Sequence, residues 1–220
     1  MNRKIKTIGM LLLIATGQIL YGQTTNSTYI IDNSIKSQVD KKVKSFGKIT
    51  MSSMDFRIYE NDSLIINTYS NDKSIENMTM AILESDTINI IGFIGMFAGF
   101  GYQITLFKDT CIVRYFAKSD MEIYKLHKND SLEFGVSVPC VTYKLALSQK
   151  PNFKKGKVLE GIIELTSDDY YEVSNGEENK YKVQLTGYFR SSSLENISKN
   201  KGDTVKNKKN IGIVVEVEDE

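Results

Sequence analysis

The fold class is decided by one stretch, Tyr181-Lys182-Val183-Gln184-Leu185-Thr186-Gly187-Tyr188-Phe189-Arg190. Apolar side chains stand at alternate positions in this stretch, at Tyr181, Val183, Leu185 and Phe189. Polar side chains fill most of the positions between them. Successive side chains of a β-strand point to opposite faces, so this alternation predicts a strand with one buried and one solvent-exposed face.

Similar patterns recur upstream at intervals of about ten residues. The expected strands are residues 49–59, 63–69, 102–107, 111–116, 121–126, 132–138, 141–147 and 159–165. Turn residues separate several of them, such as Asn61-Asp62 and Asn129-Asp130. Many short strands with little helix predict a mainly antiparallel β fold, an antiparallel β-sandwich with a barrel as the alternative.

Two short helices are expected near the start of this β-rich region. The first is indicated by apolar residues at helical spacing, namely Ile35, Val39, Val43 and Phe46. Asp32 to Ser34 are candidate N-caps, and Gly47 is the expected end. The second helix is expected over residues 74–84, where Ile75, Met78 and Ile82 fall on one side.

The first 22 residues have the layout of a cleavable secretory signal. A basic head with Arg3, Lys4 and Lys6 precedes Ile8–Leu20, which carries no charge, and Gly22 offers a small residue before the expected cut. The apolar stretch is too short to span a membrane, which needs about twenty apolar residues. No cysteine lies near the cut, so a lipoprotein is not expected. We expect a protein exported to the periplasm or secreted, and the composition, rich in Lys, Asn and Ile, is typical of bacteria.

The rest of the chain divides by composition. Residues 23–33 are rich in Ser, Thr and Asn and are expected to form a flexible leader. Residues 34–192 are expected to form a single β-rich domain. Residues 193–220 read as a charged flexible tail, in which the apolar segment 211–217 is a candidate terminal strand.

Charge and motifs exclude several function classes. Of the 28 Lys and Arg, three belong to the signal, which leaves 25 against 27 Asp and Glu and a net charge of −2 after cleavage. This balance gives no electrostatic footprint for nucleic acid. The chain has no P-loop, no dinucleotide fingerprint and no G-x-S-x-G motif, so no cofactor is expected.

The two cysteines, Cys111 and Cys140, have two open interpretations. An oxidising compartment permits a disulfide between them, which would stabilise the fold by roughly 3–4 kcal/mol on the chain-entropy account. The alternative is two buried thiols in neighbouring strands. His127 is the only histidine, and no catalytic signature surrounds either cysteine. One histidine and two separated cysteines make no recognisable ligand set, so no metal is expected.

The segment Thr87–Phe107 runs for 21 residues without a formal charge and contains four glycines. We expect two buried strands joined by a glycine-rich turn. The alternative is an exposed apolar loop that contacts a membrane or a partner through Phe93, Met96, Phe97 and Phe100. The spacing Gly95-x-x-x-Gly99 occurs in paired membrane helices, but an integral membrane span is not expected.

Two further sets of residues are candidate sites. Tyr170, Tyr171 and Tyr188 offer flat, polar-edged rings to a sugar or peptide ligand, although tyrosine is also a common packing residue of strands. Ser63 and Ser131 follow an aspartate and precede an aliphatic residue, which resembles a bacterial O-glycosylation motif. Aspartate followed by serine is also common in turns.

The sequence therefore favours a non-enzymatic binding module at the bacterial cell envelope, whose partner is an unknown envelope protein or a glycan. A carboxylate-dependent hydrolase acting on envelope polysaccharide is the first alternative. It requires two acids that face each other across a cleft, one of them with a raised pKa. A purely structural envelope protein is the second alternative.

Overall fold

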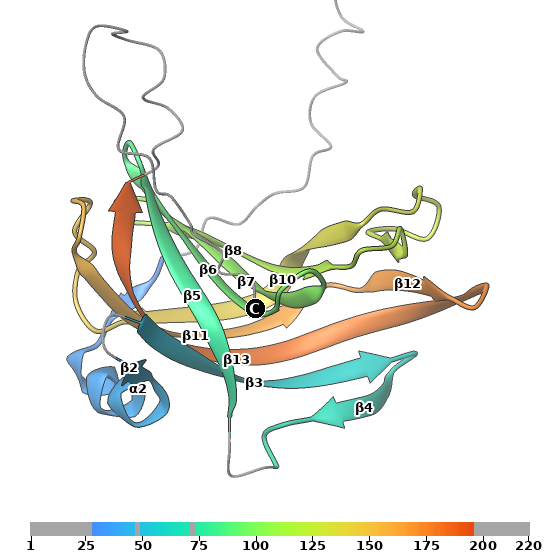
Figure 1. Ribbon diagram of the computed structural model, residues 1–220, viewed down its shortest axis with the longest axis horizontal. Coiled ribbons are helices and arrows are strands. Elements are labelled where there is room, and N and C mark those ends of the chain that lie inside the picture. Colours follow the sequence, from blue (N-terminus) through green and yellow to red (C-terminus); the bar gives the residue numbers. More distant parts are fainter. Residues whose placement is uncertain (1–27, 47–48, 71–73, 196–220) are drawn as a thin grey trace, which may run out of the picture.

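The structure, a computed structural model, describes residues 28–46, 49–70 and 74–195. Eight strands of this described part form a ring in which each strand pairs with the next (Figure 1). In ring order they are β3 (Ile49–Glu60), β5 (Ile75–Glu84), β6 (Thr87–Gly95), β7 (Gly99–Leu106), β8 (Cys111–Lys118), β10 (Gly135–Leu147), β11 (Val158–Ser167) and β13 (Glu177–Glu195).

The ring closes between the first and the last of these strands. β13 pairs with β3 from Tyr181↔Glu60 to Tyr188↔Ser53, and every neighbouring pair around the ring is antiparallel. The predicted mainly antiparallel β fold is confirmed, and the closure corresponds to the barrel alternative. Closing a sheet on itself pairs the strand edges that an open sheet would leave exposed.

Shorter elements flank the ring. They are β1 (Ile30–Ile31), the 3-10 helix η1 (Asn33–Ile35), α2 (Lys36–Lys42), β2 (Lys44–Phe46), β4 (Ser63–Asn67), β9 (Tyr124–Lys125) and β12 (Tyr170–Ser174). The Asp32 carboxylate caps η1, since it accepts a 2.9 Å hydrogen bond from the Ser34 amide. The first predicted helix is confirmed, although it ends at Lys42.

The second predicted helix, over residues 74–84, is wrong, because these residues form β5. Asn77, Thr79, Ala81 and Leu83 face the barrel interior, and Ala81 is fully buried. The outward positions include Met78, Met80 and Ile82, so both faces carry apolar side chains. This two-sided pattern hides the period of two and imitates helical spacing.

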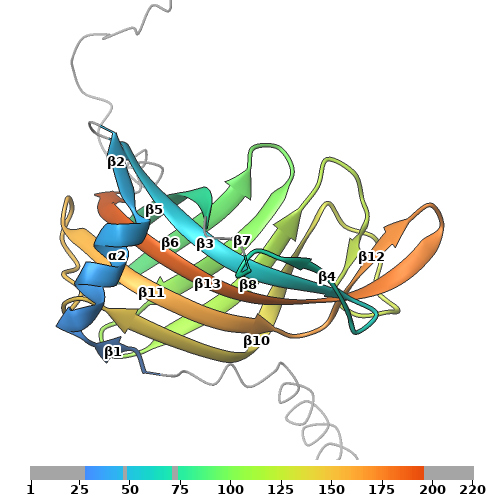
Figure 2. The same cartoon turned by 90° about the horizontal axis from the view of Figure 1, so that it is seen from below.

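Two hydrophobic clusters hold the fold together. The larger one fills the barrel, and its largest fully buried side chains include Tyr102, Tyr115, Phe189 and Met54. The smaller one lies outside the barrel, where Ile35, Val39 and Val43 pack on Ala146 and Ile162. Burying one such side chain stabilises the fold by about 1.5–3 kcal/mol, so η1 is fixed against β10 and α2 against β11 and β13 (Figure 2).

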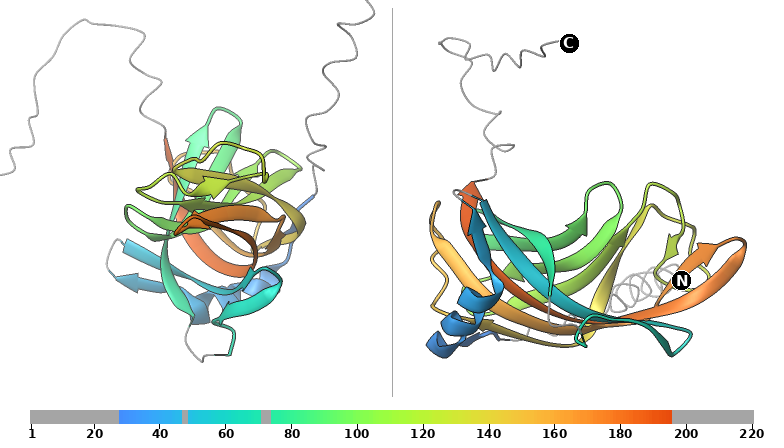
Figure 3. Two further views of the ribbon diagram at one scale, coloured as in Figure 1. Left: turned by 90° about the vertical axis from the view of Figure 1, so that its right-hand side faces the viewer. Right: turned by 60° about the horizontal axis from the view of Figure 1, so that its bottom comes forward.

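The barrel has two ends, which we name the β12 end and the α2 end. The antiparallel order puts the turn 61–62, the turn 96–98, the loop 119–134 and the turn 175–176 at the β12 end. That end faces the viewer in the left panel of Figure 3. The turns 85–86 and 107–110 and the loop 148–157 lie at the α2 end.

Of the two interpretations of the cysteines, the disulfide is the wrong one, because neither Cys111 nor Cys140 is disulfide-bonded. The paired stretch of β8 and β10 ends at Pro139↔Arg114, before either cysteine is reached. A register irregularity in β10 follows directly after Cys140. The two thiols therefore share no paired position that would bring them within bonding distance.

Several predicted segments fall wholly or partly outside the described residues. The predicted signal, residues 1–22, lies outside them, as does the candidate terminal strand 211–217. Of the predicted leader, residues 28–33 are described, and Ile30–Ile31 pair in parallel with β10. Of the predicted tail, residues 193–195 are described, and they continue β13 beside β5.

Candidate binding sites

The β6–β7 turn presents two large apolar side chains to solvent. Gly95 and Gly99 pair across the turn, and Gly95 has a positive φ of 104°. A β-carbon at Gly95 would lie 1.9 Å from the Ala98 carbonyl oxygen, so the turn requires glycine there. Met96 and Phe97 stand on this turn with 87% and 82% of their surface exposed. The buried-strand prediction for Thr87–Phe107 is confirmed for β6 and β7, and their connecting turn is the exposed part.

A neighbouring loop adds more exposed apolar side chains at the same end. Lys118 at the end of β8 pairs with Gly99 on one side and with Gly135 on the other. The loop that leaves β8 is held there, since the Ser119 amide donates a 2.8 Å hydrogen bond to the Phe134 carbonyl. We name as the apolar end surface the exposed residues of the two connections, Met96, Phe97, Met121, Leu132 and Phe134.

The charged side chains that border the apolar end surface are mostly acidic. Lys118, Asp120, Glu122 and Glu133 are all exposed and flank its residues in the sequence. Three carboxylates and one ammonium group therefore neighbour the apolar residues along the chain. A rim of this kind attracts a basic surface and repels an anionic one.

Apolar side chains continue from the turn onto the outer sheet face. Met78 pairs with Phe93, and Gly101 lies between Phe93 and Phe116 in the next two strands. Phe93 and Phe116 line a shallow hollow of about 50 Å³ together with the turn. Phe93, Met96 and Phe97 therefore lie together, as the contact prediction requires. Phe100 also lines this hollow, while its ring packs toward the barrel interior, with its centroid 4.9 Å from that of Phe56.

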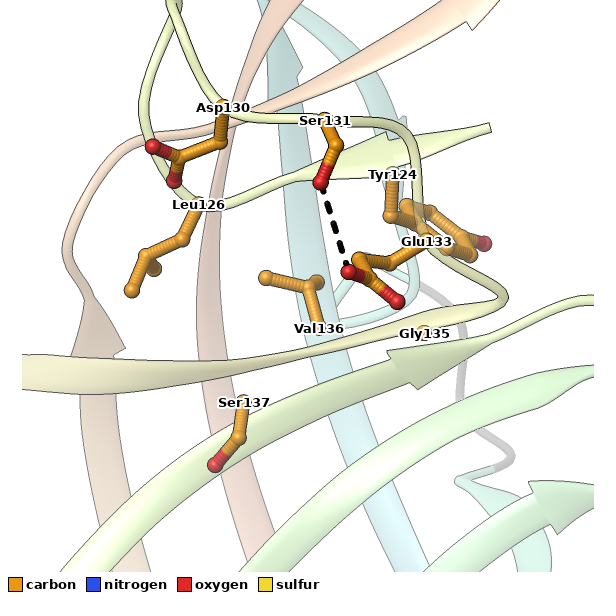
Figure 4. Close-up of a pocket in the computed structure, with 8 residues that line it drawn as sticks. All are labelled: Tyr124, Leu126, Asp130, Ser131, Glu133, Gly135, Val136 and Ser137. Carbon is orange, nitrogen blue, oxygen red and sulfur yellow. Dashed lines mark hydrogen bonds between the residues drawn. The ribbon is translucent and has the colours of Figure 1, made fainter. Parts of the chain in front are cut away.

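A second pocket lies beside this surface, between the 126–133 loop and the start of β10 (Figure 4). Its volume is about 300 Å³, and Asp130, Ser131 and Glu133 line it. Its acids are already engaged: Asp130 accepts a 2.8 Å hydrogen bond from the His127 amide, and the Ser131 hydroxyl donates to Glu133 at 3.5 Å. This pocket is therefore a polar pocket next to the apolar end surface, and its acidic side chains already have hydrogen-bond partners.

A cluster of tyrosines closes the barrel at the β12 end. The Tyr170 ring lies 5.6 Å from the Tyr115 ring, 6.3 Å from the Tyr124 ring and 5.7 Å from the Tyr181 ring, measured between centroids. Tyr170 is buried, so its ring packs in the core and offers no exposed face to a ligand. Burial, followed by the charge of Glu172, raises the pKa of Tyr124 to about 12.

Two carboxylates adjoin this tyrosine cluster. The Tyr181 hydroxyl donates a 2.5 Å hydrogen bond to Glu60. Burial raises the pKa of Glu172, and the negative charge of Glu60 raises it further. Glu60 and Glu172 line none of the three pockets described in this section.

The other two candidate tyrosines lie apart from each other. Tyr171 is half-buried in β12, opposite Lys125 of β9 and Lys180 of β13. Tyr188 is half-buried against the small cluster under α2, and the Lys42 ammonium lies 5.6 Å from its ring centroid. The three predicted tyrosines therefore do not form one site.

The sequence prediction missed a groove on the outer face of the sheet. It has a volume of about 330 Å³ and crosses β10, β11 and β13. Its polar lining includes Tyr69, Thr142, Thr166, Gln184 and Thr186. The alternating polar positions of the stretch 181–190 were the available signal, but they indicated only a solvent-exposed face.

Ser63 and Ser131 are both exposed at the β12 end, so their hydroxyls are accessible for the predicted glycosylation. Among the described residues, no group of three or more His, Cys, Asp or Glu is arranged to hold a metal ion. In the same part of the chain, no helix has the length and apolar character to cross a membrane. Comparison with protein-family models, curated proteins and solved structures finds no match for this chain.

Proposed function

We propose that this protein is a non-enzymatic binding module of the bacterial cell envelope that binds a partner protein through the apolar end surface. The observation that carries the proposal is the exposure of Met96 and Phe97, 87% and 82%, on a turn held by Gly95. Removing one such side chain from water is favourable by about 1.5–3 kcal/mol. A partner that covers both side chains is therefore strongly favoured.

The composition of the surface fits a protein partner. Methionine and phenylalanine are enriched in the buried centres of protein interfaces, and charged residues form the rim. Here two aromatic side chains, Phe97 and Phe134, are exposed at the same end of the barrel as Met96, Met121 and Leu132, and charged residues flank them in the sequence. We expect the matching surface to be apolar at its centre and basic at its edge.

The acidic rim disfavours an anionic lipid surface. Asp120, Glu122 and Glu133 outnumber Lys118 around the apolar residues. Anionic headgroups attract basic segments by about 1 kcal/mol per Lys or Arg, and they repel carboxylates. The envelope location rests on the layout of residues 1–22, which the export of the intact chain would test.

The test uses a photo-crosslinking amino acid at position 97 of the full chain, expressed in its native host. A matched control carries the same group at Leu64, an exposed apolar residue of β4. We expect one discrete adduct from position 97 and none from position 64. The partner identified in the adduct is then purified on its own. Its binding to the unmodified form of this chain is measured by calorimetry.

Met96→Ser combined with Phe97→Ser should weaken that binding at least tenfold, which corresponds to about 1.4 kcal/mol. The control variant, Leu64→Ser with Ile65→Ser, should bind like the wild type. Equal binding by all variants would contradict the proposal. So would binding to vesicles of anionic phospholipid that the Met96 and Phe97 changes abolish, because the partner would then be a membrane.

A second candidate function, hydrolysis of envelope polysaccharide, is favoured by the carboxylates of Glu60 and Glu172. A raised pKa suits Glu172 to donate a proton, and the neighbouring Glu60 carboxylate accepts a hydrogen bond from the Tyr181 hydroxyl. The assay follows the release of reducing ends from purified envelope polysaccharide. Activity lost in Glu172→Gln but kept in the exposed control Glu177→Gln would support the hydrolase and contradict a non-enzymatic role.

A further inference from the structure

Two rows of polar side chains cross the outer sheet face, and the register of the strands aligns them. The first row runs Thr142–Thr166–Gln184–Arg57 across β10, β11, β13 and β3. The second runs Lys144–Glu164–Thr186–Asp55 across the same four strands. The groove of about 330 Å³ follows these rows.

Tyr69 forms a wall of this groove and is held from several sides. Its hydroxyl shares a 2.8 Å hydrogen bond with the Thr186 hydroxyl, and its amide donates to Asn67 at 3.2 Å. The Arg57 guanidinium carbon lies 4.7 Å from the centre of its ring. Tyr69 remains partly exposed, so a fixed aromatic surface borders the groove.

Gln184 is also fixed on the floor of the groove. Its Oε1 accepts hydrogen bonds from Arg57 at 3.4 Å and from the Tyr59 hydroxyl at 3.3 Å. These bonds occupy the amide oxygen, so the amide nitrogen is left to donate to a ligand. The hydroxyls of Thr142 and Thr166 stand beside it in the same row.

Four of the five charged groups around the groove stand in two pairs of opposite charge, and Arg57 is the fifth. Lys144 and Glu164 face each other directly across β10 and β11. Asp55 accepts a 2.9 Å hydrogen bond from Ser74 and lies 3.7 Å from the Lys42 ammonium. Arg57 stacks on Tyr69, as described above. Because four of these charges are paired and the Arg57 guanidinium is engaged by Tyr69 and Gln184, the groove favours a neutral ligand over a phosphate or another anion.

We propose that this groove binds a short neutral oligosaccharide. A tyrosine ring stacks on the apolar face of a sugar, while hydroxyl and amide groups hydrogen-bond to its edge. The volume lies near the lower limit of small-molecule pockets, about 300–1,000 Å³, which suits one or two sugar units. Because Tyr69 and Gln184 are held before the ligand arrives, binding costs less ordering of side chains.

This site is independent of the proposed protein-binding function. The apolar end surface is built from the turns after β6 and β8, whereas the groove lies on β10, β11 and β13. The two sites occupy different parts of the barrel wall and can be filled together. Failure of either proposal leaves the other unaffected.

The test is a titration of the isotope-labelled protein with neutral trisaccharides, followed by amide chemical shifts. The probes are maltotriose, cellotriose and triacetylchitotriose at millimolar concentration, with sialyllactose as the charged comparison. We expect saturable shifts at the amides of Thr142, Thr166, Gln184 and Thr186 with at least one neutral probe. No saturable shift at these amides with any neutral probe would overturn the proposal, as would binding of sialyllactose alone.

Variants separate the groove from nonspecific effects. Tyr69→Ala should raise the Kd of the bound trisaccharide about tenfold or more, and Tyr69→Phe should retain part of the affinity. Tyr171→Ala is the matched control, because Tyr171 is a half-buried tyrosine outside the groove. A Kd that Tyr69→Ala leaves unchanged, in a variant whose spectrum remains folded, would overturn the assignment.

Discussion

Gly92 and Tyr102 pair across β6 and β7, and the Tyr102 ring occupies the space that a β-carbon at position 92 would need. Such a β-carbon would lie 2.2 Å from Tyr102 Cζ and 2.5 Å from its hydroxyl oxygen. From the other side of the barrel, a β-carbon at Gly187 would lie 2.5 Å from Tyr102 Cε1. The ring is therefore packed between two glycine backbones.

This packing predicts that Gly92→Ala destabilises the fold by about 3 kcal/mol, because the buried Tyr102 ring has no room to move. Urea unfolding followed by circular dichroism measures the change. Gly156→Ala is the control: its φ is +74° but nothing lies within 4 Å of the new β-carbon. That variant should lose only about 1 kcal/mol from backbone strain. Equal losses in the two variants would show that packing against Tyr102 is unimportant.

The two cysteine thiols predict a loss of stability at alkaline pH. Burial raises the pKa of Cys111 to about 11 and that of Cys140 to about 12, against an ordinary value of 9.0. The unfolded chain therefore loses its thiol protons at lower pH than the folded one. Stability is complete below pH 9 and falls above it, by at most about 1.4 kcal/mol per pH unit for each thiol.

The free energy of unfolding is measured above pH 9 for the wild type and for the double variant Cys111→Ala with Cys140→Ala. These values check that stability falls as the pH rises. The double variant should lose part of the alkaline slope, while the buried tyrosines contribute the rest. Denatured, unreduced protein should also yield two reactive thiols. A disulfide in the purified protein would contradict the structure.

The position of Glu172 predicts a stabilising substitution. Burial and the charge of Glu60 raise the pKa of Glu172, so its contribution to stability is present at acidic pH and is lost as the pH rises through the folded-state pKa. Glu172→Gln should therefore raise the thermal midpoint near neutral pH and leave it unchanged below about pH 4. Glu177→Gln, at an exposed position, should change neither. A lower thermal midpoint for Glu172→Gln at neutral pH would contradict the inference that the charged form of Glu172 destabilises the fold.

Arg190 connects α2 to the barrel wall. Its guanidinium donates a 2.6 Å hydrogen bond to Glu160 and also pairs with Asp40 of α2. Arg190→Gln should cost about 2 kcal/mol, since the mostly buried Glu160 loses its cation. The exposed pair Lys44–Glu76 is the comparison, and Lys44→Gln should cost less than about 0.5 kcal/mol. Urea unfolding of both variants measures the two losses of unfolding free energy. Similar losses would contradict a stabilising role for the contacts of Arg190 with Glu160 and Asp40.

Local patterns predicted most of the strands. The alternation over residues 181–190 identified β13, and the glycine-rich segment 87–107 was recognised as two strands joined by a turn. Asn61 and Asp62 both have positive φ, 47° and 67°, as a tight hairpin turn between β3 and β4 requires. These features depend only on residues close in the chain, so a sequence reveals them.

The sites depend on strand order, which the sequence does not show. Tyr69 and Thr186 are 117 residues apart, yet their hydroxyls meet because β3 pairs with β13. Tyr170 is a ligand candidate from the sequence because tyrosine combines a flat ring with a hydroxyl, but in the barrel its side chain is buried. Cys111 and Cys140 lie in neighbouring strands but outside the paired stretch, a detail of register that spacing cannot reveal.

The same closure sets the order in which the protein is able to fold. Glu60 and Tyr181 are 121 residues apart, and their strands must meet before the ring is complete. Contacts of such long range slow folding, because the entropy of closing the loop is lost before the contact forms. Until β13 has been synthesised, β3 and β11 have unpaired edges that attract other strands. A growing chain of this protein therefore stays incompletely folded until β13 has been synthesised. Until then its unpaired strand edges make it prone to aggregate with other chains.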